Sequence, residues 1–213
     1  NKILVPLLLN KHSKITIVSH NEVSNGFQKD HTWTGIDVTK PYYMVLSYDN
    51  TNNPIRWYKS FSYSVINTYG GQNGTIHIWK VVPSSSTISM ETYYVTATLF
   101  QRIKQSYVVI SNRIQKEHNS NPNNVTYTCS GDGYLFAVST IFDGGNGGNA
   151  SINVTKATTI SALNTPFDFF SNYSSGVRAV YKITKGSVVT ITSNTNSFDG
   201  PRGYETFAVV IYT

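Results

Sequence analysis

Residues 55–65 have the sequence IRWYKSFSYSV, and this stretch decides the fold class. Successive side chains of a β-strand point to opposite faces, so alternation of apolar and polar residues predicts a strand with one face in a core. The odd positions supply the core face and hold Ile55, Trp57, Lys59, Phe61, Tyr63 and Val65. Between them stand Arg, Tyr and Ser, which predict a solvent face.

The same alternation recurs in three other segments, at residues 93–99, 177–183 and 207–211. Shorter apolar runs predict further strands at 14–19, 42–48, 75–82, 106–110, 125–129, 134–142, 157–160 and 187–192. Asn-Gly and Asp-Gly pairs separate many of them and favour the positive φ of tight turns. Many short strands with such turns predict an all-β protein of the β-sandwich or jelly-roll type with at least eight strands.

One segment departs from this pattern. Phe100, Ile103, Tyr107, Ile110 and Ile114 recur at helical spacing, although the Val-Val-Ile at 108–110 favours a strand. The Gly- and Asn-rich residues 143–149 predict a loop. No internal repeat or linker is visible, so the sequence predicts an N-terminal extension at 1–13 and one sandwich body at 14–213.

Charge is scarce in the composition. Only 11 of 213 residues are Asp or Glu and 13% are charged, against about a quarter in ordinary soluble domains. Asn, Ser and Thr number 21, 24 and 24. Acid denaturation acts mainly through carboxylates that are paired in the native state. A surface solvated by neutral groups is therefore expected to tolerate acid, which suggests an extracellular, cell-surface protein.

Several classes of function are disfavoured. The net charge is +6, but the basic residues are scattered, whereas nucleic-acid sites gather them on one face. No apolar run approaches the ~20 residues of a membrane span. Cys129 is the single cysteine, which excludes an internal disulfide, and we expect it to be a small buried hydrophobe.

The sequence does not predict an enzyme, a cofactor or a metal site. Ser, His and Asp are all present, but no nucleophile-elbow pattern occurs. His12, His20, His31 and His77 match no metal-binding spacing. An acid-stable secreted hydrolase remains the enzymatic alternative, and it would need a convergent site in a pocket.

N-glycosylation motifs are the clearest modification signal. Five Asn-x-Ser/Thr motifs occur, about as many as chance would place in this composition, at Asn73, Asn124, Asn149, Asn153 and Asn172. Four of them lie in or beside predicted turns, where an acceptor is exposed. We expect at least three to carry covalent N-glycans.

The N-terminal segment is continuously apolar. Its aliphatic residues are Ile3, Leu4, Val5, Leu7, Leu8 and Leu9. Leaving them in water would forgo on the order of ten kcal/mol of burial. The run is either the first strand of the body or a donated strand that completes the sheet of the next subunit. Pro6 disfavours a central strand position.

This layout, with an apolar N-terminal extension, an all-β body, sparse acids and glycosylation motifs, resembles the thread-type pilins of acidophilic archaea. The resemblance implies β-sandwich subunits joined head to tail by donor-strand complementation. The expected function is therefore a structural subunit of an extracellular, glycosylated homopolymeric filament whose partners are identical subunits. A coat or turret jelly-roll protein of an archaeal virus is the main alternative, and an S-layer or adhesin domain is a third.

Overall fold

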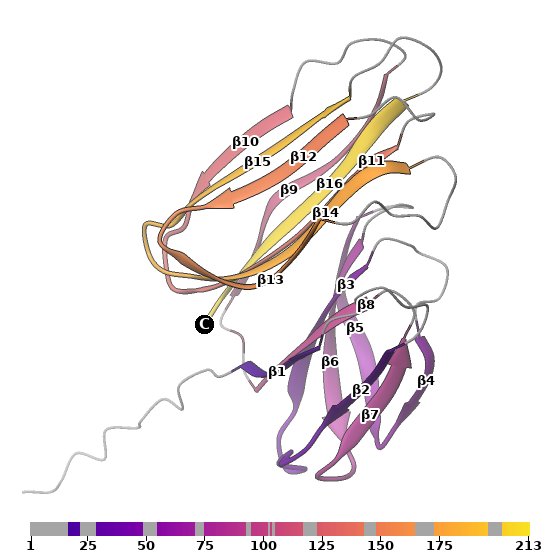
Figure 1. Cartoon of the computed structure of the whole chain (residues 1–213). Coiled ribbons are helices and arrows are strands. Elements are labelled where there is room, and N and C mark those ends of the chain that lie inside the picture. The colour runs from indigo at the N-terminus through magenta and orange to yellow at the C-terminus, as the bar shows by residue number, and fades with distance from the viewer. Residues whose placement is uncertain are drawn as a thin grey trace, which may run out of the picture.

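The structure is a computed structural model (Figure 1). It describes residues 17–21, 29–48, 55–70, 75–92, 95–101, 103, 105–116, 123–142, 148–164, 173–195 and 202–213. These residues form 16 strands and no helix. The prediction of an all-β fold with at least eight strands is therefore confirmed.

The first eight strands form a β-sandwich, here called sandwich 1. Its five-stranded sheet A has the order β1 (Ile17–Asn21), β8 (Val95–Phe100), β3 (Tyr42–Tyr48), β6 (Thr75–Pro83) and β5 (Phe61–Gly70). Its three-stranded sheet B has the order β2 (Lys29–Trp33), β7 (Ile88–Thr92) and β4 (Ile55–Lys59). All of these pairings are antiparallel.

The last eight strands form sandwich 2. Its five-stranded sheet C has the order β9 (Gln105–Lys116), β16 (Arg202–Tyr212), β11 (Gly133–Phe142), β14 (Tyr173–Ile183) and β13 (Ala157–Asn164). Its three-stranded sheet D has the order β10 (Asn123–Thr128), β15 (Val188–Thr195) and β12 (Gly148–Val154). Figure 1 shows the two sandwiches in contact, in colours from the two halves of the chain.

The two sandwiches have the same topology. Numbered within its own half, each has one sheet of order 1-8-3-6-5 and one of order 2-7-4. This is a jelly-roll order in which the fifth strand has joined the larger sheet. The two sandwiches also share the turn between their fourth and fifth strands. Ser60 in sandwich 1 and Lys156 in sandwich 2 both have positive φ there, 70° and 50°. The body at 14–213, predicted as one sandwich, is thus divided into two that repeat one fold.

Three apolar clusters hold these layers together. The core of sandwich 1 lies between sheets A and B, and the core of sandwich 2 lies between sheets C and D. A third cluster, the central core, joins the other faces of sheets A and C. In it, Phe100 of β8 makes edge contacts with Tyr134 and Phe136 of β11, at ring-centroid distances of 5.3 and 6.0 Å.

Strand β11 illustrates the consequence for sequence. Leu135 and Ala137 belong to the core of sandwich 2, while Phe136 and Val138 belong to the central core. A strand covered on both faces has a nearly continuous apolar sequence. In the outer sheet B, by contrast, strand β7 alternates between fully buried and partly buried residues along its length.

Some local predictions were wrong. The single strand expected at 55–65 is two strands, because the chain turns at Ser60 from sheet B into sheet A. The helical spacing at 100–114 falls mostly on β9, where strand propensity and pairing with β16 prevail. Strands β2 and β7 were not predicted, and β12 begins at Gly148, inside the expected loop.

Candidate interaction site

The candidate interaction site is one edge of sandwich 1, where the edge strands β4 of sheet B and β5 of sheet A lie. In β5, Tyr63 and Val65 lie opposite Val81 and Trp79 of β6. Directly opposed residues of an antiparallel pair share a face. Val81 and Trp79 belong to the core of sandwich 1, so Tyr63 and Val65 also lie on the face of sheet A that is directed toward sheet B.

Strand β4 contributes the second wall. Tyr58 lies opposite Met90, which is buried in the core of sandwich 1, so Tyr58 also lies on the inner face. The centroid of its ring is 5.3 Å from that of Tyr63 and 5.2 Å from that of Phe61. Trp57 lies opposite Glu91 on the outer face, where Arg56 Nη1 donates to Glu91 Oε1 at 2.6 Å.

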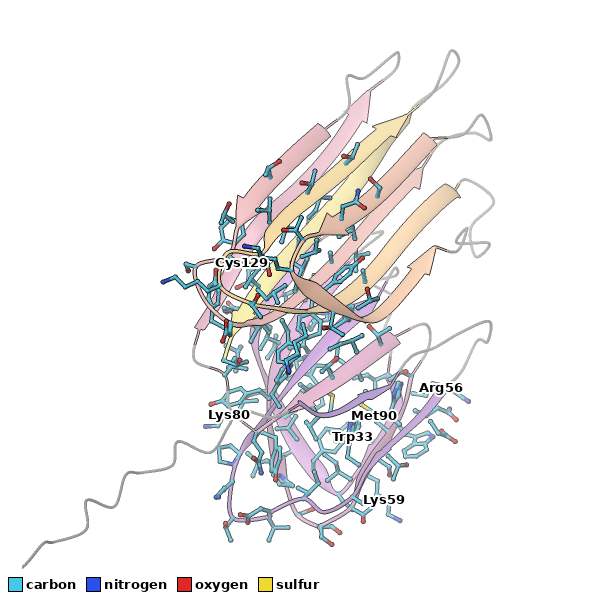
Figure 2. All side chains as sticks on the ribbon, turned by 60° about the vertical axis from the view of Figure 1, so that its left-hand side comes forward. Trp33, Arg56, Lys59, Lys80, Met90 and Cys129 are labelled. Carbon is cyan, nitrogen blue, oxygen red and sulfur yellow. The ribbon has the colours of Figure 1, made fainter. Side chains whose placement is uncertain are left out.

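These inner-face side chains remain substantially exposed. Tyr58 is 49% exposed, Tyr63 38% and Val65 54%. We call the three residues the open edge. Figure 2 shows Trp33 and Met90 inside sandwich 1, while Arg56 and Lys59 of β4 lie at its margin. The outermost part of this sandwich therefore has a core-type surface that the described residues leave uncovered.

The equivalent edge of sandwich 2 is closed. Ile152 of β12 is only 7% exposed, and its carbonyl oxygen accepts a hydrogen bond of 3.3 Å from the Tyr181 hydroxyl of β14. This bond ties the two layers together. On β13 the inner-face positions hold Ala157 and Thr159, opposite Ile183 and Tyr181. The side chains at these two described positions are small or polar, so they expose no large apolar surface there.

The open edge packs against the buried ring of Trp79. Trp79 stacks on Tyr63 at 3.9 Å, and His77 packs against Trp79 with ring centroids 6.4 Å apart. His77 Nδ1 and Thr68 Oγ1 are 2.8 Å apart. Burial lowers the pKa of His77 because it disfavours the charged imidazolium. His77 therefore adds no charge to the inner face at neutral pH.

The predicted site residues have different outcomes. The aliphatic residues Ile3, Leu4, Val5, Leu7, Leu8 and Leu9 lie outside the described residues, as do Asn73 and Asn172. Asn124 lies in β10, and Asn149 and Asn153 lie in β12. Asn153 is exposed. These three asparagines are strand residues of sheet D and not turn residues.

His31 and His77 have different partners, whereas His12 lies outside the described residues and only the backbone of His20, in β1, is described. His31 is buried, with its Nε2 2.7 Å from Thr92 Oγ1 and its ring stacked on Trp33. His77 is bonded to Thr68 instead. In the part of the chain that the structure describes, no group of three or more His, Cys, Asp or Glu could hold a metal ion. Cys129 is buried in the core of sandwich 2, and burial raises the pKa of its thiol.

Comparison with family models, curated proteins and solved structures gives no match. Among the described residues, no helix has the length and hydropathy needed to cross a membrane. Sequence reasoning found the apolar positions of 55–65 but assigned them all to a buried face. Which of them stay exposed depends on the cover that sheet B provides, and no local pattern encodes that.

Proposed function

We propose that the chain is a structural subunit of an extracellular, glycosylated homopolymeric filament. Residues 3–9 of one copy would add as an extra strand to β5 of the next copy and cover its open edge. The observation that supports this proposal most directly is the half-exposed inner face of Tyr58, Tyr63 and Val65.

The dimensions of the acceptor suit such a strand. Strand β5 has 10 residues and lies at the edge of sheet A. At about 3.3 Å per residue, the run of seven residues spans roughly 23 Å and strand β5 roughly 33 Å. Charged residues and proline usually protect an edge strand from pairing with another chain. Strand β5 contains neither. Pro6 of the donor is compatible with an edge position, where one unmade hydrogen bond is tolerated.

The proposed contact joins two different surfaces. A heterologous contact of this kind produces rings when the rotation closes and open filaments when it does not. Main-chain hydrogen bonds would supply affinity, and pockets for alternate side chains would supply specificity. Burial of the donor's aliphatic side chains adds roughly 1.5–3 kcal/mol for each one that becomes fully buried.

The decisive experiment is electron microscopy of the purified protein and of two matched lysine variants. Val65→Lys places a charge at the open edge and should abolish filaments. Thr159→Lys places the same charge on the inner-face edge position of sandwich 2 and should leave filaments intact. Deleting residues 1–12 should also abolish filaments, and a synthetic peptide of residues 1–12 should raise the Tm of the deleted protein by mass action.

Equal polymerisation of both lysine variants would refute the open edge as the acceptor. Unfolding of the protein on deletion of residues 1–12, with a monomeric full-length chain, would refute strand donation. The run would then be the first strand of its own subunit.

The tandem jelly-roll topology favours a second candidate, a coat or turret protein of an archaeal virus. Jelly rolls are common in capsid proteins, although a shared fold is an argument by analogy. Closed particles or defined rings in the same micrographs would favour this candidate over the filament.

A further inference from the structure

The two outer sheets protect their edges differently. In sheet B, edge strand β2 contains Lys29 and Asp30, and edge strand β4 contains Arg56 and Lys59. In sheet D, edge strands β10 and β12 have the sequences NNVTYT and GNASINV, without a charge or a proline. An uncharged edge presents unpaired backbone groups that can pair with another chain.

The unprotected edges carry three of the five glycosylation motifs. Asn124 lies on β10, and Asn149 and Asn153 lie on β12. The central strand β15, sequence VVTITSNT, holds no motif. The motifs of sheet D therefore occur on both of its edges and not between them.

The register brings these asparagines close together. Asn124 and Ser151 both pair with Thr192, one from each side. Asn149 and Asn153 lie two residues before and after Ser151. With strands about 4.8 Å apart and about 3.4 Å between residues, the three positions surround Thr192 within roughly 10 Å.

All three positions belong to the solvent face of sheet D. In β15, Val189 and Ile191 are buried in the core of sandwich 2. Asn153 pairs with Thr190 and Asn124 with Thr192, the positions that alternate with the buried ones. Asn149 pairs with Asn194 on the same face. Asn153 is exposed, as are Thr126 and Thr155, which supply the hydroxyls of two motifs.

We propose that N-linked glycans on Asn124, Asn149 and Asn153 shield both edges of sheet D from β-pairing, in the role that charged residues fill in sheet B. This inference rests on the extracellular location in the proposed function. In the modification, the Asn amide nitrogen displaces the phosphate of a lipid-linked oligosaccharide from the anomeric carbon. A carbon–nitrogen bond forms, the amide loses one proton, and the lipid phosphate leaves. The glycans would thus keep the edges of sheet D from pairing with other copies, so that copies associate through β5 alone.

The first test is glycopeptide mapping of protein from its native source. Sugar on Asn124 and on at least one of Asn149 and Asn153 is the expected result, because two large glycans four residues apart can compete for space. An intact mass equal to that of the bare chain, or an edge without sugar, would overturn the proposal.

The second test measures self-association in the Val65→Lys background, so that filaments do not obscure the result. The triple variant N124Q/N149Q/N153Q, produced in the glycosylating host, should form species at least several-fold heavier in sedimentation velocity. Asn194→Gln, on the same face but outside any motif, is the control and should sediment like its parent. Circular dichroism should show that both variants keep their strand content.

The third test replaces the shield by charge. Adding Thr126→Lys and Ser151→Lys to the triple variant places a lysine on each edge strand and should restore the parental sedimentation. A triple variant that sediments like its parent would refute edge shielding. Persistent association after the lysines are added would also refute it, since the glycans would then act by another route. Filament failure is scored separately, by microscopy of the chain without Val65→Lys.

Discussion

Sandwich 1 and sandwich 2 share one topology but fill it with different side chains. The core of sandwich 1 is built around large residues, among them Trp33, Tyr42, Phe61 and Trp79. The core of sandwich 2 is mainly aliphatic and, among the residues that the structure describes, contains no Trp or Phe; three of its buried residues are alanines, Ala137, Ala179 and Ala208. Side chains of very different size thus support the same strand order, provided that the volume between the sheets is filled.

This difference explains why the repeat is not visible in the sequence. A jelly roll requires strands in a given order and corners at given places, while the residues that fill it can vary. The positive-φ corners at Ser60 and Lys156 are conserved in conformation but occupied by different residues. The open edge also follows from the difference. The large side chains of Tyr58 and Tyr63 stay partly exposed at the margin of sandwich 1, whereas the edge strand β13 of sandwich 2 has Ala157 and Thr159 on its inner face.

All three tryptophans, Trp33, Trp57 and Trp79, belong to sandwich 1. Tryptophan fluorescence therefore reports on sandwich 1 alone, while far-ultraviolet circular dichroism reports on both sandwiches. Comparing the two signals tests whether the sandwiches unfold together.

The largest expected effect comes from the aromatic core. Trp33 is 2% exposed, and Trp33→Ala should destabilise the protein by about 3–5 kcal/mol. The Tm should fall by at least about 6 °C, at about 2–4 °C per kcal/mol for a chain of this size. Ile191→Ala is the matched change in sandwich 2, with an expected cost of about 2–5 kcal/mol. If the central core couples the sandwiches, Ile191→Ala should also shift the fluorescence transition; a shift in dichroism alone would contradict coupling.

The central core itself is tested by Phe136→Ala. Phe136 is fully buried and packs on Phe100 across the junction. The substitution should cost about 3–5 kcal/mol, and the fluorescence and dichroism transitions should separate because the sandwiches lose their shared contact. Coincident transitions in this variant would mean that the rest of the central core suffices for coupling.

A smaller effect distinguishes the two edges. Val65 is 54% exposed and Val189 is fully buried. Val65→Thr should change the stability of the monomer by no more than about 0.5 kcal/mol, whereas Val189→Thr buries a hydroxyl and should cost about 1–3 kcal/mol. Urea denaturation at constant m-value measures both. Equal costs would indicate that the open edge is covered in the monomer.

The smallest effect concerns pH. Burial lowers the pKa of His77 from 6.5, so below about pH 6.5 the unfolded chain binds a proton more readily than the folded chain. Stability from the neutral His77 is fully present above that pH and is lost as the pH falls. His77→Gln should therefore flatten the decrease in Tm between pH 7.5 and 4.5. Unchanged slopes in the variant would assign the decrease to other groups.

The sequence by itself determined the fold class and the place of most strands. Alternation in 55–65 and the continuous apolar stretch in β11 and β16 depend only on whether one or both faces of a strand are covered. The sequence also supplied the glycosylation motifs and the apolar run at 3–9. These are local features, so neighbouring residues are enough to reveal them.

Only the tertiary structure decided how the strands pair. The first strand of each sandwich pairs with the eighth, nearly a whole sandwich away in sequence, and no local pattern specifies such a distant partner. That pairing divides the body in two, covers both faces of central strands such as β11 and leaves Tyr58, Tyr63 and Val65 exposed at one edge. It also gathers Asn124, Asn149 and Asn153 around Thr192. Burial depends on which strands come to lie beside each other. The open edge and the grouping of these asparagines therefore could not be predicted from the sequence, although the motifs and most strands could.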